Sequence, residues 1–200
     1  MANDGVIGLD GAELRILEAA IAAIEEFGLK NVTVRRIAAK AGVNIAAINY
    51  YFRTKEQLLD KVLEMTVDNA FDWSDLAQTD SLPPKEQLFA IMDHLTKGAL
   101  NFPETTRAHF YEAMVNGNNE TRAVYEMNRF METIFQKFVK NGCRMKEKDL
   151  RFSITQVFMS GLFSIGVMPN VYGIFQHADL TKDAERRKFL HHLIDRLIDE

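Results

Sequence analysis

Three residues at fixed spacing constrain this chain more than any other feature of its sequence. Ala38, Gly42 and Ile48 stand at relative positions 0, +4 and +10 in the segment TVRRIAAKAGVNIAAINYYF. A small residue at the first position lets two helices approach, glycine can adopt a left-handed turn, and an apolar residue at the third position fastens the second helix to a core. The segment from Thr33 to Phe52 therefore predicts a helix-turn-helix.

Capping signals support this interpretation. Asp10 followed by Glu13 fits a capping box before an apolar helical pattern that ends near Gly28. Thr33 and Asn44 are good N-caps for the two helices of the motif. Thr54 with Gln57 opens a fourth helix in the same way, and these four short helices fill residues 10–70.

The rest of the chain is also expected to be helical. Helical patterns cover about residues 84–101, 104–116, 120–142, 148–168 and 182–199, and no strand pattern interrupts them. We expect an all-α protein with a small N-terminal three-helix unit over residues 10–55, which contains the helix-turn-helix, and a larger helical bundle over residues 56–200.

Charge is distributed unevenly along the chain. The net charge is −4, yet residues 27–55 contain six basic residues and no acidic one. This segment carries +6, and the other 171 residues carry −10. An acid-free basic window in an acidic chain favours a polyanionic partner such as DNA.

Other bulk features indicate a cytoplasmic globular protein without a membrane partner. Hydrophobic residues make up 47% of the chain, which is unlike disordered proteins. The lone cysteine, Cys143, cannot form an internal disulfide, and the N-terminus lacks the pattern of a secretory leader. The longest apolar stretch, Val157–Pro169, is shorter than the ~20 residues that span a bilayer.

In a helix-turn-helix, the second helix enters the major groove and the flanking residues hold phosphates. Asn49 could pair with an adenine edge, and Ile45 or Ala46 could contact a thymine methyl group. Asn44 could equally be only a cap, and of Arg35 and Arg36 we expect one to contact DNA. The candidate DNA-binding residues are Thr33, Arg35, Arg36, Asn44, Ile45, Ala46, Asn49, Tyr50, Tyr51 and Lys55.

Residues 12–60 resemble the N-terminal domain of the tetracycline-repressor (TetR) family. The resemblance rests on Phe27-Gly28, the start at Thr33, the Ala-Gly-Val turn, the Tyr-Tyr-Phe run and the Lys-Glu-Gln-Leu opening of the next helix. It implies a homodimer that reads a palindromic operator and is released by a small effector, so that the chain is a regulator and not an enzyme. It also implies phosphate contacts for Thr33, Tyr50 and Lys55.

The chain departs from the common pattern of the family at two places. Ala46-Ala47 replaces a frequent Gly-Thr pair, which removes one hydroxyl that could contact phosphate, and Asn49 replaces a frequent aromatic residue. These departures leave the fold unaffected. Because of these two departures, the operator sequence of this chain cannot be inferred from the operators of relatives.

Phenylalanine and methionine side chains recur between residues 88 and 163, and they either fill a core or line an effector pocket. Aromatic and methionine side chains at helical spacing more often belong to a core, although methionine suits adaptable apolar sites and the resemblance favours a pocket. Arg107, His109 and Gln156 are additional polar anchors to consider. The candidate pocket residues are Phe89, Met92, His94, Phe110, Met114, Phe130, Met131, Phe158 and Met159.

The last two helices are predicted to form a dimer interface. One is apolar nearly all round and the other carries an apolar stripe, so that one copy could not easily bury both. The candidate interface residues are Phe158, Leu162, Ile165, Phe189, Leu193 and Leu197.

No catalytic, cofactor or metal-binding motif stands out. His109 and Glu112 are three residues apart, but two ligands do not make a metal site. Two alternatives stay open. The chain could be a helical small-molecule carrier or enzyme with a helix-turn-helix-like corner, or a DNA-binding protein whose bundle serves dimerisation only.

Overall fold

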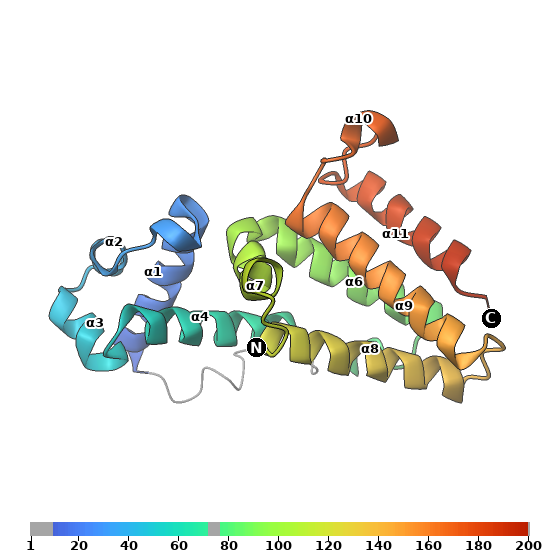
Figure 1. Ribbon diagram of the computed structural model, residues 1–200, viewed down its shortest axis with the longest axis horizontal. Helices are drawn as coiled ribbons and strands as arrows, with labels where there is room; N and C mark the ends of the chain where they lie inside the picture. The colour runs from blue at the N-terminus through green and yellow to red at the C-terminus, as the bar shows by residue number, and fades with distance from the viewer. Residues whose placement is uncertain (1–9, 72–76, 200) are drawn as a thin grey trace. The chain divides into compact units, whose positions relative to one another are not determined.

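The computed structural model describes residues 10–71 and 77–199, and all regular elements in these ranges are helices (Figure 1). The chain folds into two compact units. The first comprises the chain up to Ala70 together with Glu104–Ala123, and the second comprises Phe71–Pro103 together with the chain from Val124 onwards. The predicted domain boundary between residues 55 and 56 falls at the first turn of a helix that belongs entirely to the first unit.

The first unit holds the predicted helix-turn-helix. Its elements are α1 (Gly11–Phe27), the 3₁₀ turn η1 (Leu29–Asn31), α2 (Val34–Ala41), α3 (Ile45–Phe52), α4 (Lys55–Ala70) and nearly all of α7 (Pro103–Asn116). Leu17 and Ile24 of α1, Ile37 of α2, Ile48 of α3 and Leu58 of α4 meet in one buried core. The apolar periodicity of the sequence therefore converges on this core.

The three spaced residues have the predicted roles. Gly42 lies in the left-handed region at φ 65° and ψ 32°, and its N–H donates to the Ala38 carbonyl. Ala38 and Ile48 are 5% and 2% exposed. Glycine suits this turn because a Cβ at positive φ is strained. The helix-turn-helix prediction is confirmed.

The second unit is a helical bundle. It contains α6 (Pro84–Asn101), most of α8 (Arg122–Lys140), α9 (Glu147–Gly161), the π-helical turn η2 (Leu162–Val167), α10 (Gly173–Gln176) and α11 (Asp183–Leu197). α6, α9 and α11 pack on one another (Figure 1). The expected single helix over residues 148–168 thus changes to π-helical geometry after Gly161.

A glycine sets the close packing of these helices. A Cβ on Gly161 would lie 2.6 Å from Met92 Cε of α6 and 3.2 Å from Leu190 Cδ2 of α11. Both distances are shorter than ordinary van der Waals contacts, so an added Cβ would displace the ends of the Met92 and Leu190 side chains.

The continuous helical stretch Glu147–Val167 is long and apolar enough to cross a membrane by length and composition. Its most apolar window is 56% buried inside the fold. The helix contributes Val157, Phe158 and Ile165 to the core of the second unit, as the core helix of a globular bundle does.

Candidate nucleic-acid interface

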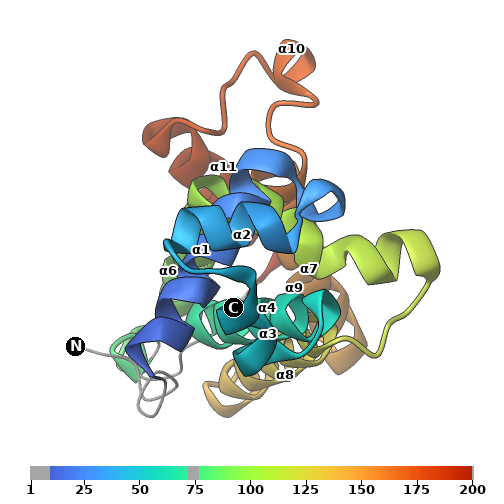
Figure 2. The same ribbon diagram turned by 90° about the vertical axis from the view of Figure 1, so that its left-hand side faces the viewer.

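α3 is anchored by one face and presents the other. Ile48 and Phe52, four residues apart, are 2% and 6% exposed. Elsewhere on the helix Ile45, Asn49 and Tyr50 are exposed, Tyr50 by 81%. In Figure 2, α2 and α3 lie toward the viewer. An amide, a phenol and an aliphatic group on one free helix face can make base-edge and phosphate contacts in a major groove.

Both predicted caps of the motif are present. The Thr33 hydroxyl accepts a hydrogen bond from the Arg36 N–H at 3.3 Å, and Asn44 Oδ1 accepts one from the Ala47 N–H at 2.8 Å. The cap accounts for the presence of Asn44, as the alternative interpretation predicted. Its contact with a base stays a prediction, and so does that of Ala46, which is exposed.

Internal contacts occupy two basic side chains of α2. Arg36 donates to the Asn31 carbonyl at 2.6 Å, and its guanidinium lies 4.0 Å from the centroid of the Phe27 ring. Lys40 forms an ion pair with Glu26 at 2.5 Å. These contacts tie α2 to the end of α1, so they stabilise the fold of the first unit.

Three other cations of the basic window face solvent. Within the described part of the chain, the side chains of Arg35, Arg53 and Lys55 have no hydrogen-bond or ion-pair partner, and Arg35 and Arg53 are exposed. Arg35 is therefore the arginine of α2 that we expect to contact phosphate. Sequence reasoning missed Arg53, although its position directly after α3 in the basic window could have indicated it.

Tyr51 has a role that the sequence did not indicate. Its hydroxyl donates to Asp10 Oδ2 at 2.6 Å, and Asp10 Oδ1 caps α1 by accepting from the Ala12 N–H. The hydrogen bond from Tyr51 lowers the pKa of the Asp10 carboxyl, and the same bond raises the pKa of Tyr51. The phenol thus joins α3 to the start of α1, and its contact with DNA stays a prediction.

A carboxylate joins α7 to the helix-turn-helix core. Glu25, near the end of α1, accepts hydrogen bonds from the Glu104 N–H at 3.1 Å, the Thr105 N–H at 2.8 Å and the Thr105 hydroxyl at 2.6 Å. These donors lie in the first turn of α7, where backbone N–H groups lack helical partners. Glu25 therefore caps a distant helix, because the Glu104 N–H that it accepts from lies 79 residues later in the chain.

A second link joins α7 to α4. The Thr66 hydroxyl lies 3.1 Å from His109 Nε2. Burial lowers the pKa of His109 to about 4, because an imidazolium cation would lose its hydration there. His109 is half-buried in the first unit and in contact with Thr66, and its role as a polar anchor for a ligand stays a prediction.

The family model described as bacterial regulatory proteins, tetR family, matches residues 16–62. The match runs from α1 into α4 and includes both helices of the helix-turn-helix, α2 and α3. This part of the chain is a DNA-binding domain of the TetR family.

Relatives and solved structures agree with this TetR-family assignment. The chain is 53% identical over 47 residues to the HTH-type transcriptional dual regulator CecR of Shigella flexneri, covering 24% of this chain and 21% of CecR. It is 32% identical over 94 residues to the HTH-type transcriptional regulator BetI of Escherichia coli, covering 46% of this chain and 45% of BetI. The chain thus spans less than half the length of these two curated relatives.

The likeness in fold extends further. A TetR transcription regulator from Haloarcula marismortui superposes with a TM-score of 0.66 at 17% identity, covering 94% of this chain and 98% of that one. HlyIIR, a hemolysin II transcriptional regulator, superposes with a TM-score of 0.61 at 20% identity, covering 94% and 98%. At this identity the likeness establishes the shared fold of the TetR family, an all-α chain with an N-terminal helix-turn-helix.

The predicted pocket residues of this chain have varied environments. Phe89, Met92, Phe130 and Phe158 are buried in the second unit, and Met131 is half-buried there. Phe110 is buried in the first unit. The other three predicted residues are exposed: His94, Met114 and Met159. Four of the nine therefore share one core, and their contact with an effector stays a prediction.

The predicted interface residues divide into two groups. Phe158, Leu162 and Ile165 are 1%, 8% and 0% exposed in the single chain. They are buried within the second unit of the single chain, and their contact with a partner stays a prediction. The other three residues form a half-buried stripe at four-residue spacing on α11: Phe189, Leu193 and Leu197.

Proposed function

We propose that this chain is a TetR-family transcriptional regulator that binds a palindromic DNA operator as a homodimer. The observation that carries the proposal is the free face of α3, anchored by Ile48 and Phe52 and flanked by unpaired cations. Repression would follow from occupancy of the operator, and the protein would act in the cytoplasm, where bacterial DNA lies. No step of this function requires a catalytic group or a cofactor.

Selection of bound fragments from genomic DNA at a stated salt concentration, followed by footprinting, tests the proposal. We expect a palindrome whose half-sites are separated by about one DNA turn, ~34–36 Å, or a multiple of it. Enrichment of nothing above non-specific background would contradict the proposal, and would favour a carrier or an enzyme.

Substitutions at two neighbouring residues of α3 distinguish base recognition from phosphate contact. We expect Asn49→Ala to relax the preference at one base position per half-site, because a bidentate amide contact discriminates by about 1–3 kcal/mol. Tyr50→Ala should weaken binding to all sequences alike, since phosphate contacts carry no sequence information. A uniform loss of affinity in the Asn49 variant would refute its role as a base reader.

The unpaired cations allow a test with a matched charge control. Lys55→Gln should lower affinity and reduce the slope of log K against log salt by about 1 per half-site. Lys188→Gln removes the same charge from an exposed position on α11. Equal effects of the two variants would mean that only net charge matters, and that Lys55 makes no specific contact.

The homodimer is proposed to form through the half-buried stripe on α11. Leu193 is half-buried in the single chain, and its neighbour His192 is exposed. Leu193→Asp should therefore produce monomers in analytical ultracentrifugation at micromolar concentration, whereas His192→Asp should not. A wild-type monomer at that concentration would refute the homodimer.

Release by a small effector is proposed to act through α7. This helix is joined to α1 by Glu25 and to α4 by the contact between Thr66 and His109. An effector that binds more tightly to a conformation with α7 in one position than to a conformation with α7 in another would change the fraction of dimers that can bind the operator. The nine predicted pocket residues remain the proposed contacts of this apolar or amphipathic effector.

A thermal-shift screen with a broad apolar library tests for the effector. A compound at 100 times its Kd should stabilise the folded chain by about 2.7 kcal/mol. Compounds that raise the melting temperature should also weaken operator binding. If no compound did so, the bundle would serve dimerisation only.

A further inference from the structure

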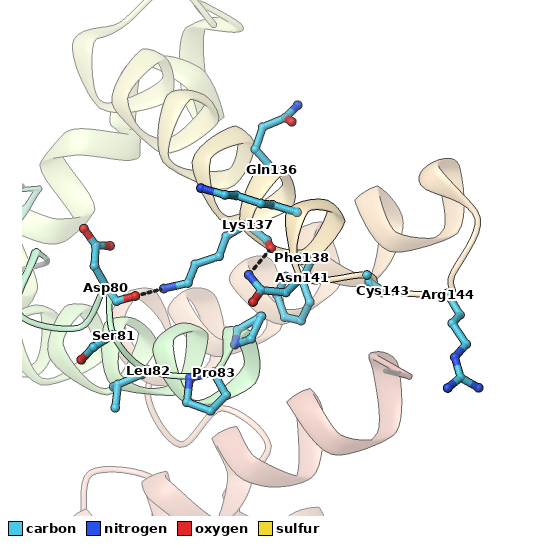
Figure 3. A pocket seen from close by; sticks show the side chains of 13 residues that line it. Asp80, Ser81, Leu82, Pro83, Gln136, Lys137, Phe138, Asn141, Cys143 and Arg144 are labelled. Carbon is cyan, nitrogen blue, oxygen red and sulfur yellow. Dashed lines mark hydrogen bonds between the residues drawn. The ribbon is translucent and has the colours of Figure 1, made fainter.

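A hollow in the second unit lies where two helix ends meet. Its volume is about 1090 Å³ (Figure 3), at the upper end of the sizes of small-molecule sites, which are about 300–1,000 Å³. One wall is the segment of residues 80–84, which leads into α6, and the other comprises the last turn of α8 with the loop up to Arg144. None of the predicted pocket residues lines it.

The side chains around this hollow carry excess positive charge. Its lining contains three basic residues, Lys137, Lys140 and Arg144, and one acidic residue, Asp80, which gives a net charge of +2. The whole chain carries −4. A local excess of positive charge in an acidic protein favours binding of anions.

The lysines of the hollow are not neutralised by carboxylates. Lys137 Nζ donates to the main-chain carbonyl of Asp80 at 2.7 Å (Figure 3), and the Asp80 carboxylate accepts from Gln87 Nε2 at 2.8 Å. Lys140 is exposed and has no partner within residues 10–71 and 77–199. Arg144 extends away from Asp80 in Figure 3, so it adds to the positive electrostatic potential of the hollow without blocking its opening.

A helix end adds a second source of positive potential. α6 is 18 residues long and begins at Pro84, and no side chain caps its first turn. The N-terminus of a helix carries a partial positive charge from its unsatisfied N–H groups. Pro83 and Pro84 also present apolar surface to the hollow, which suits the carbon skeleton of an organic ligand.

We propose that this hollow binds a small organic anion. Its carboxylate or phosphate group is held by Lys137 and Lys140, and its carbon skeleton lies on the proline segment that begins α6. Charge-assisted hydrogen bonds between ammonium groups and such oxygens are short and strong. The binding reaction is independent of DNA binding, so it can be tested whether or not the operator proposal holds.

Calorimetric titration at low ionic strength tests the proposal with citrate and inorganic phosphate as probes. We expect saturable binding of at least one probe, and weakening of at least 10-fold in Lys140→Glu. Lys140 has no internal partner, so this variant should fold, which circular dichroism checks. Lys188→Glu on α11 carries the same charge change outside the hollow and should change affinity less than twofold.

Cys143 reports where the probe binds. It is the only cysteine of the chain and lines the hollow. A bound anion should slow alkylation of Cys143 by neutral iodoacetamide at least threefold, because it covers the thiol and disfavours the thiolate. The slowing should vanish in Lys140→Glu and should not be reproduced by sodium chloride at matched ionic strength.

Three results would overturn the proposal. The first is no binding of either probe, the second is equal weakening in the Lys140 and Lys188 variants, and the third is binding that leaves the alkylation rate of Cys143 unchanged. Binding of only one probe would support the proposal and identify the head group as carboxylate or phosphate.

Discussion

Glu25→Ala should loosen α7 from the core of the first unit. The substitution removes the acceptor of three hydrogen bonds, from the N–H of Glu104 and from the N–H and hydroxyl of Thr105. Loss of a helix cap costs about 0.5–2 kcal/mol, and a hydrogen bond to a charged group contributes about 1.5–3 kcal/mol. Because these donors are only part-buried and can rehydrate, we expect a loss of about 2 kcal/mol.

Amide hydrogen exchange measures this loss locally. A loss of about 2 kcal/mol corresponds to roughly 30-fold faster exchange of the Thr105 amide. The matched control is Glu26→Ala, which removes an adjacent carboxylate whose partner is Lys40 in a solvent-accessible ion pair. Such pairs contribute about 0–1 kcal/mol, so the control should leave the Thr105 amide unchanged. Equal effects of the two variants on Thr105 would refute the capping role of Glu25.

Two further predictions concern stability. The pKa of His109 is lowered to about 4, so the unfolded chain binds more protons below its ordinary pKa of 6.5. The free energy of unfolding measured in urea should therefore be highest above pH 6.5 and fall by up to about 1.4 kcal/mol per pH unit toward pH 4. His109→Gln should flatten this pH dependence. An unchanged pH profile in that variant would contradict the prediction. Gly161→Ala should lower the free energy of unfolding by about 1–3 kcal/mol through overpacking against Met92. Adding Met92→Ala to that variant should restore part of the loss. If the losses of the two substitutions simply added, the close contact between the two residues would be refuted.

Local signals made the helix-turn-helix predictable. Thr33 and Asn44 cap helices that begin at the next residue, and Gly42 makes a turn whose geometry depends on its own backbone. Ile48 follows from periodicity, since a buried position recurs about every 3.6 residues. Each of these features depends on neighbours within a few positions, which is the range that a single sequence reveals.

Tertiary contacts decided what the sequence left open. Tyr51 and Asp10 are 41 residues apart, and nothing local indicates that the phenol is engaged by a carboxylate. Arg35 and Arg36 are adjacent and chemically identical, and only the Phe27 ring and a nearby carbonyl distinguish them. An apolar helix containing Phe158 could have faced a partner or a core, and the surrounding helices place it in the core.

The inclusion of Glu104–Ala123 in the first unit has a consequence for exchanging parts between regulators. A chimera made with a single crossover after α4 would take α1 from one parent and α7 from the other. Its Glu25 would face a first turn selected in another protein, and Thr66 would face a foreign residue in place of His109. A DNA-binding unit that keeps its own specificity therefore has to be transplanted as two segments of chain, with three crossovers, after residues 70, 103 and 123, so that residues 104–123 are transferred together with the helix-turn-helix.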